Sequence, residues 1–402
     1  MKLLSQRVMQ VKPSPTLAVT AKANELKAAG KDIVGLGSGE PDFDTPDHIK
    51  DAAIQALKSG FTKYTAVGGI PDLKKALLAR FQEDYGLAYD TNQVLITVGG
   101  KQAFYNLMMA TINPGDGVLI PAPYWVSYPD MTLLAGGKPQ IIQTKEENGF
   151  KLTPKSLEKA ITRRSRFLVI NSPSNPTGAA YTKEELAALG KVILRHPKLW
   201  VITDDIYDKI VFDDFKFYNL PMVVPELKNR TIVLNGLSKA YSMTGWRLGY
   251  AIGDPTIIAA METIQSQSTS NPVSFVQKGA VVALSGPQDF IGTMVAAFKE
   301  RRDYVVDQFN SMPGITCRTP EGAFYAYPNC GGLMGKKGPD GKKIKNSLQL
   351  AALMLENYGV AVVPGSAFGM DPYFRISYAT SMANLEKAME RIRAMAEQLT
   401  AA

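Results

Sequence analysis

Between about residues 90 and 252, short apolar runs alternate with amphipathic stretches, and this alternation restricts the fold more than any other feature. The runs are rich in β-branched side chains, which is typical of strands buried in a parallel sheet. Such strands are predicted at residues 94–98, 118–121, 140–143, 167–171, 200–203, 231–234 and 248–252. The stretches between or after them, such as 183–195 and 255–267, have helical patterns. We therefore expect an α/β doubly wound domain with a large, mostly parallel sheet.

The two ends of the chain have a different pattern. Helices are predicted at 16–29 and 72–85, and a charged helix runs through 300–309. Strands follow near 322–327, 360–363 and 374–378, before a last helix near 385–399. This pattern predicts a smaller α+β domain that the N-terminal segment joins. The expected division is an N-terminal arm (1–12), a large domain (49–300) and a discontinuous small domain (13–48 and 301–402).

Composition excludes several classes of protein. Of 402 residues, 45% are hydrophobic and 20% are charged, which is ordinary for a globular chain. No stretch approaches the roughly 18 apolar residues of a membrane-spanning helix, and MKLLSQRVMQVKPSP lacks the apolar core of a signal peptide. Two cysteines, Cys317 and Cys330, make neither a disulfide framework nor a zinc cluster. We expect a cytoplasmic protein without a membrane segment or a metal.

The net charge of +8 raises the question of nucleic-acid binding. The basic residues are spread along the chain, and the one dense run, 336–345, is interleaved with glycine and proline. That composition favours a solvated surface loop over a nucleic-acid-binding arm. We expect no nucleic-acid partner.

Because ligands of open α/β sheets bind at the carboxyl ends of the strands, the residues that follow the strands are the candidates for chemistry. Gly99 and Gly100 follow the strand at 94–98 and open a helix, where backbone N–H groups can approach a phosphate. The spacing does not fit a P-loop, and the separate segment 35–39 is not a dinucleotide fingerprint because residue 40 is a glutamate. A plain strand-to-helix turn is the alternative.

Asn175 lies in NSPSNPTG (171–178), where two X-Pro steps stiffen the loop after a strand. Its amide can donate and accept hydrogen bonds, although the segment is also explained as a rigid turn. Asp204 ends the strand at 200–203, and a carboxylate there is costly unless it meets a cation or several donors. Tyr207, three residues on, can reach the same space. A helix N-cap is the alternative role for Asp204.

Lys239 follows the strand at 231–234, and a lysine buried among apolar and small residues loses proton affinity and becomes nucleophilic. Arg247, eight residues later, suits a phosphate. Arg375 lies in an alternating strand of the small domain, where it can hold a carboxylate bidentately. The alternatives are an exposed loop lysine and a surface ion pair. Together these residues match the needs of pyridoxal 5′-phosphate, which takes a lysine Schiff base and an aspartate at the pyridinium nitrogen.

The sequence resembles the class I aminotransferases of the aspartate aminotransferase family, which are fold type I pyridoxal-phosphate enzymes, and within them the bacterial class Ib. The supporting stretches follow the family's order over nearly the whole chain. They are GEPDFDTP (39–46), TKYT (62–65), GGKQA (99–103), PYWVSYP (123–129), NSPSNPTG (171–178), TDDIY (203–207), SKAYSMTGWRLGY (238–250), VAVVPGSAFG (360–369) and FRISYATS (374–381). The resemblance implies a seven-stranded large domain, a small α+β domain and a homodimer with shared active sites.

The resemblance also implies a role for each matching residue. Lys239 would hold the cofactor as a Schiff base and move the substrate's proton, while Asp204 would keep the pyridine nitrogen protonated. Tyr207 and Asn175 would hydrogen-bond the 3-oxygen of the ring, and Trp125 would stack on the ring. The phosphate would be bound by Gly100, Ser238, Arg247 and, from the other subunit, Tyr64. Arg375 would bind the substrate's α-carboxylate, with help from Trp125, Asn175 and the backbone of Gly39.

The distal carboxylate of the substrate separates branches of the family. The animal-type branch uses an arginine of the partner subunit, and the matching stretch here, 266–269, holds none. Class Ib enzymes use a lysine after the paired glycines, where Lys101 stands, so the resemblance implies dicarboxylic amino acids and 2-oxo acids as substrates. A further phosphate contact is the alternative for Lys101. Lys12 stands where a basic residue accompanies prephenate transamination, or it is a solvated residue of a flexible arm.

The resemblance implies reversible transamination of aspartate with 2-oxoglutarate, and other functions are alternatives to it. One is an aminotransferase of aromatic or other amino acids, and another is a pyridoxal-phosphate β-lyase. Two carboxylate-binding residues, Lys101 and Arg375, favour a dicarboxylate and disfavour the lyase. A DNA-binding regulator with an aminotransferase-like domain and an inactive homologue are disfavoured, because every expected functional position is filled and no helix-turn-helix segment is found.

Overall fold

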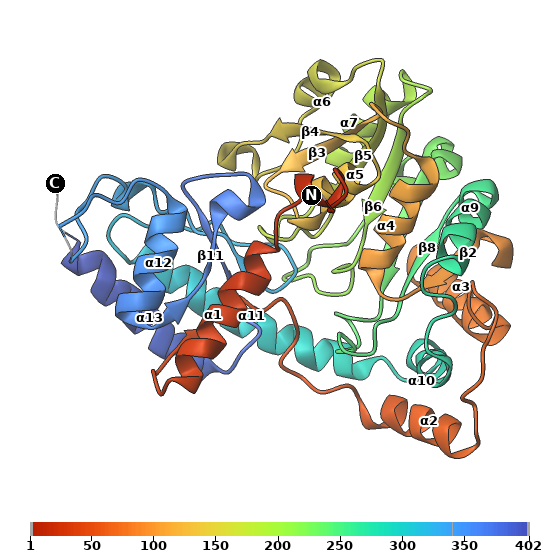
Figure 1. Ribbon diagram of the computed structural model, residues 1–402, viewed down its shortest axis with the longest axis horizontal. Coiled ribbons are helices and arrows are strands. Elements are labelled where there is room, and N and C mark those ends of the chain that lie inside the picture. The colour runs from red at the N-terminus through yellow and green to blue at the C-terminus, as the bar shows by residue number, and fades with distance from the viewer. Residues whose placement is uncertain (1–2, 340, 400–402) are drawn as a thin grey trace.

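The computed structural model describes residues 3–339 and 341–399 and has a large sheet at its centre (Figure 1). The spatial order of the strands is β2-β8-β7-β6-β5-β3-β4, and only β8 is antiparallel to its neighbours. The strands are β2 (Val94–Thr97), β3 (Gly117–Ala122), β4 (Lys138–Gln143), β5 (Ser165–Asn171), β6 (Trp200–Asp204), β7 (Thr231–Gly236) and β8 (Gly249–Ile252). The mostly parallel seven-stranded sheet is therefore confirmed.

Helices cover both faces of this sheet, which is the reason that its inner strands are mostly apolar, whereas the edge strand β4 is polar and partly exposed. Alternate residues of β5 point to opposite faces: Phe167 and Val169 pack with α4, α5 and α9, whereas Leu168 and Ile170 pack with α6, α7 and α8. The helices are α4 (Gly100–Thr111), α5 (Ser127–Leu134), α6 (Pro154–Ala160), α7 (Lys183–Leu194), α8 (Leu220–Val223) and α9 (Pro255–Ser266). Three more pack beyond β2, namely α2 (Asp47–Lys58), α3 (Pro71–Tyr85) and α10 (Ser274–Ser285).

The smaller part of the molecule contains two short sheets. One pairs β1 (Val34–Gly35) with β10 (Val360–Ala361), and the other has the order β11-β12-β9. Its strands are β9 (Tyr325–Ala326), β11 (Val363–Pro364) and β12 (Phe374–Ser377). The single strand predicted at 360–363 is therefore wrong, because Val362 separates two strands that pair with different partners. Around these sheets lie α1 (Pro15–Ala28), α12 (Ser347–Tyr358) and α13 (Met382–Gln398).

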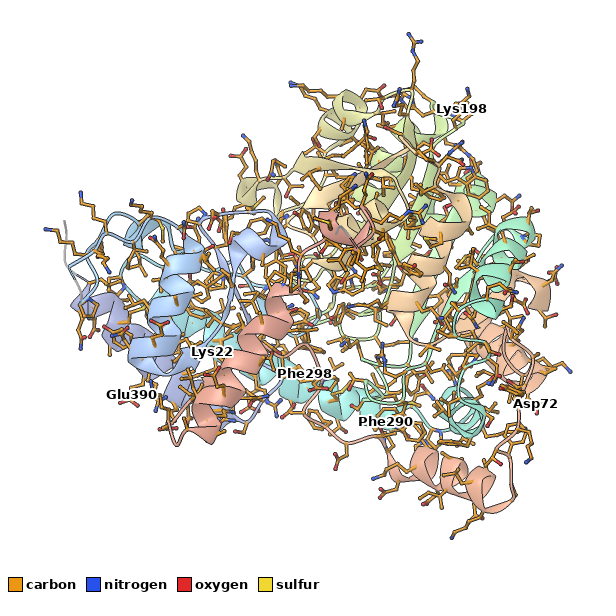
Figure 2. All side chains as sticks on the ribbon, in the orientation of Figure 1. Lys22, Asp72, Lys198, Phe290, Phe298 and Glu390 are labelled. Carbon is orange, nitrogen blue, oxygen red and sulfur yellow. The ribbon has the colours of Figure 1, made fainter. Side chains whose placement is uncertain are left out.

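A long helix, α11 (Asp289–Asn310), connects the two parts and is longer than the 300–309 segment predicted. Figure 2 labels two of its aromatic side chains: Phe298 belongs to the core of the smaller part, and Phe290 packs against the core beneath α3 and α10. The helix thus contributes to two cores. The domain boundary expected at residue 300 falls within it, so the division of the chain into domains stays a prediction.

Two negative observations concern the described residues. Within 3–339 and 341–399, no single helix is both long and apolar enough to cross a bilayer; α10 and α11 meet that test only together, and they are bent by 83° at the break between them. The same residues hold no group of three or more His, Cys, Asp or Glu side chains that could bind a metal ion. Both Cys317 and Cys330 are buried free thiols.

Candidate active site

The carboxyl ends of the central strands bring the predicted residues to one edge of the sheet. Asn171 at the end of β5 pairs with Asp204 at the end of β6, and Lys239 follows three residues after β7 ends. Because β8 is antiparallel, it begins at this same edge, with Gly249 opposite both Gly236 and Thr97. This reversal places Arg247, two residues before β8, against the turn that opens α4.

These segments surround a cavity of about 420 Å³ at the edge of the sheet. Its lining includes most of the residues that the sequence predicts, drawn from both parts of the molecule. They are Gly39, Gly100, Lys101, Trp125, Asn175, Asp204, Tyr207, Ser238, Lys239, Arg247 and Arg375. Two predicted residues do not line it. Tyr64 is 91% exposed on a loop, and Lys12 follows a short helix, η1 (Val8–Gln10), that lies against α5.

Lys239 is the nucleophile candidate in this cavity. Burial lowers the pKa of its ammonium from 10.5 to about 8, although the negative charge of Glu40 opposes that change. The Nζ atom donates a hydrogen bond to the backbone carbonyl of Gly39, which reaches it from the smaller part of the molecule. A lysine of this pKa has a neutral, nucleophilic fraction near neutral pH.

Asp204 shares the cavity and has the opposite perturbation. Burial raises the pKa of its carboxyl from 3.8 to about 6, although hydrogen bonds from Tyr128 and from the Ile206 backbone favour the charged form. The cavity therefore contains a carboxylate that is incompletely compensated. A cationic ring nitrogen would supply the missing positive charge.

Arg375 lies on β12 and is 2% exposed. One of its N–H groups has no hydrogen-bond partner among the described residues. Its Nη1 donates to Oδ1 of Asn175 at 2.8 Å, and its Nη2 donates to the carbonyl of Gly37 at 2.7 Å. Its buried Nε has no hydrogen-bond partner among the residues that the structure describes. An unpaired N–H of a buried guanidinium is costly, so this edge of Arg375 is suited to a carboxylate.

The turn between β2 and α4 brings Arg247 and the start of a helix together at one end of the cavity. Gly99 has φ +79°, and a Cβ placed on it would lie 2.6 Å from Nη2 of Arg247. The absence of side chains there lets the guanidinium approach the first turn of α4, where backbone N–H groups lack intrahelical partners. Gly99 and Gly100 thus do more than make a plain turn.

Trp125 and Lys101 form one wall of the cavity. The Nζ atom of Lys101 lies 5.2 Å from the centroid of the Trp125 ring, within the range of a cation–π contact. Desolvation lowers the pKa of Lys101, and the positive charge of Arg247 adds to this effect. The ammonium of Lys101 thus lies beside an aromatic face, with no carboxylate in salt-bridge contact among the described residues to offset its desolvation.

Among the cavity residues that sequence reasoning missed are Tyr128, Tyr325 and Glu40. Tyr128 bonds Asp204, the hydroxyl of Tyr325 lies 2.8 Å from that of Tyr207, and Glu40 accepts a hydrogen bond from Thr244 at 3.0 Å. Each lies inside a stretch already singled out for its neighbours or beside one. Nothing in the sequence distinguishes these three residues from the many other aromatic and acidic residues of the chain.

Comparisons with known proteins cover the whole chain. The family model described as aminotransferase class I and II matches residues 31–392. An aspartate/prephenate aminotransferase of Cereibacter sphaeroides is 56% identical over 400 residues, 100% of both chains. The crystal structure of the aspartate aminotransferase from Rhizobium meliloti has a TM-score of 0.96 at 49% identity and covers 99% of each chain. An aspartate aminotransferase from Thermus thermophilus with maleate has a TM-score of 0.92 at 41% identity, covering 98% of this chain and 100% of that one.

Proposed function

We infer the function from the premise that this chain belongs to the class I and II aminotransferase family. The protein is an aminotransferase. The observation that carries the assignment to a cofactor is the convergence of Lys239, Asp204 and the Gly99–Arg247 anion site on one cavity. Pyridoxal 5′-phosphate fits this set, which consists of a lysine amine, an incompletely compensated carboxylate and an anion site. When bound, it supplies an aldehyde and an electron-withdrawing pyridinium ring.

Each residue then has a definite task. Lys239 is the amine that would hold the aldehyde of the cofactor, and, once the amino acid had displaced it, its free amine would carry the proton to and from the substrate's α-carbon. Asp204 keeps the pyridine nitrogen protonated, while Trp125 covers the ring. Tyr207 and Asn175 donate hydrogen bonds to the 3-oxygen. The phosphate is held by Gly100, Ser238, Arg247 and the Tyr64 of a second subunit in a homodimer with shared sites.

The substrates follow from the two cations left for carboxylates. Arg375 binds the α-carboxylate with its incompletely paired guanidinium, supported by Asn175 and by the backbone at Gly39. Lys101 binds the distal carboxylate, since its ammonium faces the cavity beside Trp125. We propose reversible transamination between L-aspartate and 2-oxoglutarate, giving oxaloacetate and L-glutamate.

Prephenate is the second substrate that we propose, with arogenate as the product. A relative of 56% identity is named an aspartate/prephenate aminotransferase. Lys12 is the residue that we assign to this activity. Its positive charge opposes the rise that burial causes in the pKa of Asp130, so it lies near α5, whose neighbour Trp125 lines the cavity. A role there requires the 1–12 arm to move toward the cavity.

Reduction of the bound cofactor tests the assignment of Lys239. Borohydride treatment of the yellow protein, followed by peptide mass spectrometry, is expected to place one pyridoxyl group on the peptide that contains Lys239. Lys239→Ala is expected to lose both the label and transamination. Lys198→Ala, at an exposed lysine on the outer rim of the molecule (Figure 2), keeps both. Label on another lysine, or transamination by Lys239→Ala at the wild-type rate, would contradict the assignment.

The remaining parts of the proposal concern location and organisation. We propose a cytoplasmic homodimer with a large domain (49–300), a small domain (13–48 and 301–402) and an arm (1–12). The two free buried thiols are compatible with a reducing compartment. The small domain contributes Gly39 and Arg375, so its closure on the large domain completes the substrate site.

A further inference from the structure

We propose that Tyr325 is a positioning residue for two neighbours: its hydroxyl makes Tyr207 a hydrogen-bond donor into the cavity, and its ring holds the guanidinium of Arg375. The proposal rests on the proposed function, because it assigns the direction of a hydrogen bond to the cofactor's 3-oxygen. Tyr325 comes from the smaller part of the molecule, whereas Tyr207 follows β6 of the large sheet. It therefore links the cofactor side of the cavity to the carboxylate side.

Strand register explains why Tyr325 and Arg375 meet. Residue 325 of β9 pairs with Ser377 of β12 in the antiparallel sheet. Arg375, two residues before Ser377, is the diagonal neighbour of Tyr325 on the same face, within reach of long side chains. The guanidinium carbon lies 4.5 Å from the centroid of the Tyr325 ring and 5.0 Å from that of Phe368. The two rings confine the guanidinium, whose buried Nε has no hydrogen-bond partner among the described residues.

The number of hydrogens that each phenol can donate relates the direction of the Tyr325–Tyr207 hydrogen bond to what Tyr207 can offer a ligand. A phenol has one hydrogen to donate and two lone pairs that accept. The two hydroxyl oxygens are 2.8 Å apart, and in the described part of the chain each is the other's only hydrogen-bond partner. If Tyr207 donated to Tyr325, it would have no hydrogen left for a ligand. Donation from Tyr325 to Tyr207 frees the hydrogen of Tyr207 to point into the cavity.

Burial strengthens this arrangement. Tyr207 is 3% exposed and Tyr325 is 1% exposed, and desolvation raises the pKa of both phenols, so both keep their hydrogens. Water is a poor competitor at such positions. In a low-dielectric site, a hydroxyl that accepts a hydrogen bond becomes a better donor in turn. Loss of the Tyr325 hydroxyl is therefore expected to weaken donation by Tyr207.

The absorption spectrum of the bound cofactor reports this donation directly. A donor to the 3-oxygen stabilises the deprotonated form, so a weaker donor raises the pH at which the bound cofactor loses its proton and changes colour. We expect Tyr325→Phe, which keeps the ring, to raise that midpoint by about half a pH unit. Tyr327→Phe is the matched control: its buried phenol, two residues away, bonds the carbonyl of Met370 at 3.2 Å and lies outside the cavity. It is expected to leave the midpoint unchanged.

A double-mutant cycle separates positioning from a general structural effect. In a Tyr207→Phe background, Tyr325→Phe is expected to cause no further shift of the midpoint. Incorporation of 3-fluorotyrosine at position 325, whose more acidic phenol donates more strongly, is expected to move the midpoint downward. This second replacement also keeps the test available if Tyr325→Phe does not fold. An unchanged midpoint in both variants, or an equal shift in the Tyr207→Phe background, would overturn the proposal.

The ring has its own test. Tyr325→Leu removes one of the two rings that confine Arg375 and is expected to weaken binding of a non-reacting dicarboxylate such as succinate about tenfold, whereas Tyr325→Phe leaves it unchanged. Equal affinity in the leucine variant would overturn this half of the proposal. Failure of the proposed function is distinguishable, because wild-type protein would then bind no cofactor and show no spectrum to titrate.

Discussion

Burial of the charged forms of Lys239 and Asp204 costs free energy as long as no ligand occupies the cavity. Burial lowers the pKa of the lysine to about 8 and raises that of the aspartate to about 6, so each charged form is disfavoured in the cavity. In the proposed function, a pyridinium cation beside Asp204 and a covalent bond from Lys239 to the cofactor would remove both penalties. The proposed site would then favour the bound cofactor at the expense of the stability of the cofactor-free protein.

Asp204→Asn is accordingly expected to stabilise the cofactor-free protein near pH 7. A carboxyl whose folded pKa is raised contributes stability below about pH 4 and loses it as pH rises through about 6. The change from 3.8 to about 6 corresponds to about 3 kcal/mol in the free energy of unfolding. Urea denaturation of wild type and variant across this range measures the difference.

Two outcomes would contradict this prediction. A difference between wild type and Asp204→Asn that does not change from pH 4 to pH 7 would mean that Asp204 does not titrate there. A variant less stable than wild type at pH 7 would mean that the hydrogen bond from Tyr128 outweighs desolvation. The variant is also expected to bind the cofactor more weakly, which separates its effect on stability from its effect on the site.

Some site residues were foreseeable from the sequence and others were not. Lys239, Asp204 and Arg375 carry charges at the ends or in the middle of apolar strands, where a charge is unusual enough to attract notice. Tyr128 and Tyr325 are aromatic residues in apolar surroundings, and nothing local separates them from core side chains such as Phe324. Only strand register and tertiary contacts reveal that their hydroxyls meet Asp204 and Tyr207.

At the scale of elements, the turn between β2 and α4 makes the anion site. Gly99→Ala would force a side chain onto φ +79° and place its Cβ 2.6 Å from Arg247. We expect this variant to bind the cofactor at least about tenfold more weakly, because Arg247 is displaced from the phosphate. Equilibrium titration of the cofactor-free protein, followed by absorbance, measures the affinity.

Gly30→Ala is the matched control for the backbone part of that effect. Gly30 has φ +81° and follows α1, but its added Cβ would meet no heavy atom within 4 Å. The control is expected to lose about 1 kcal/mol of stability and to keep its cofactor affinity. If both variants bound the cofactor equally well, Gly99 would have no role beyond its conformation.

The inner strands of the large sheet were predictable because each contains a short apolar run that helices bury on both faces of the sheet. The smaller part was less predictable. Residues 360–364 read as one apolar strand, yet β10 pairs with β1 and β11 pairs with β12. The interruption at Val362 depends on the pairing partners of the two strands, and β1 lies more than 300 residues earlier in the chain. No local pattern in the sequence therefore predicts it. The length of α11 was also missed, because Phe290 and Ile291 at its start pack on one core, whereas most of its later apolar residues pack on another.

At the scale of the whole molecule, the proposed homodimer explains why Tyr64 lies far from its expected task. Tyr64 is 91% exposed and lies outside the cavity of its own chain. We expect Tyr64→Phe to weaken cofactor binding all the same, because its hydroxyl would serve the partner's phosphate. The affinity is measured as for the Gly99 variant.

Mixed dimers test which subunit Tyr64 serves. A Lys239→Ala chain paired with a Tyr64→Phe chain contains one site with both an intact lysine and, from the partner, an intact tyrosine. Mixing the two variants is expected to restore wild-type cofactor affinity in half of the sites of each mixed dimer. No restoration would place Tyr64 in its own subunit's site, or in none.

The central claim is that this aminotransferase acts on dicarboxylic amino acids, and a single-turnover panel tests it most directly. The cofactor-loaded protein is mixed with aspartate, glutamate, kynurenine, alanine, aromatic and branched amino acids, and arogenate, while the absorbance of the cofactor is followed. Aspartate and glutamate are expected to convert it fastest, with oxaloacetate and 2-oxoglutarate as the products, and Lys101→Ala is expected to lose this preference. Faster conversion by alanine or the aromatic amino acids, or release of pyruvate or fumarate from aspartate, would contradict the account.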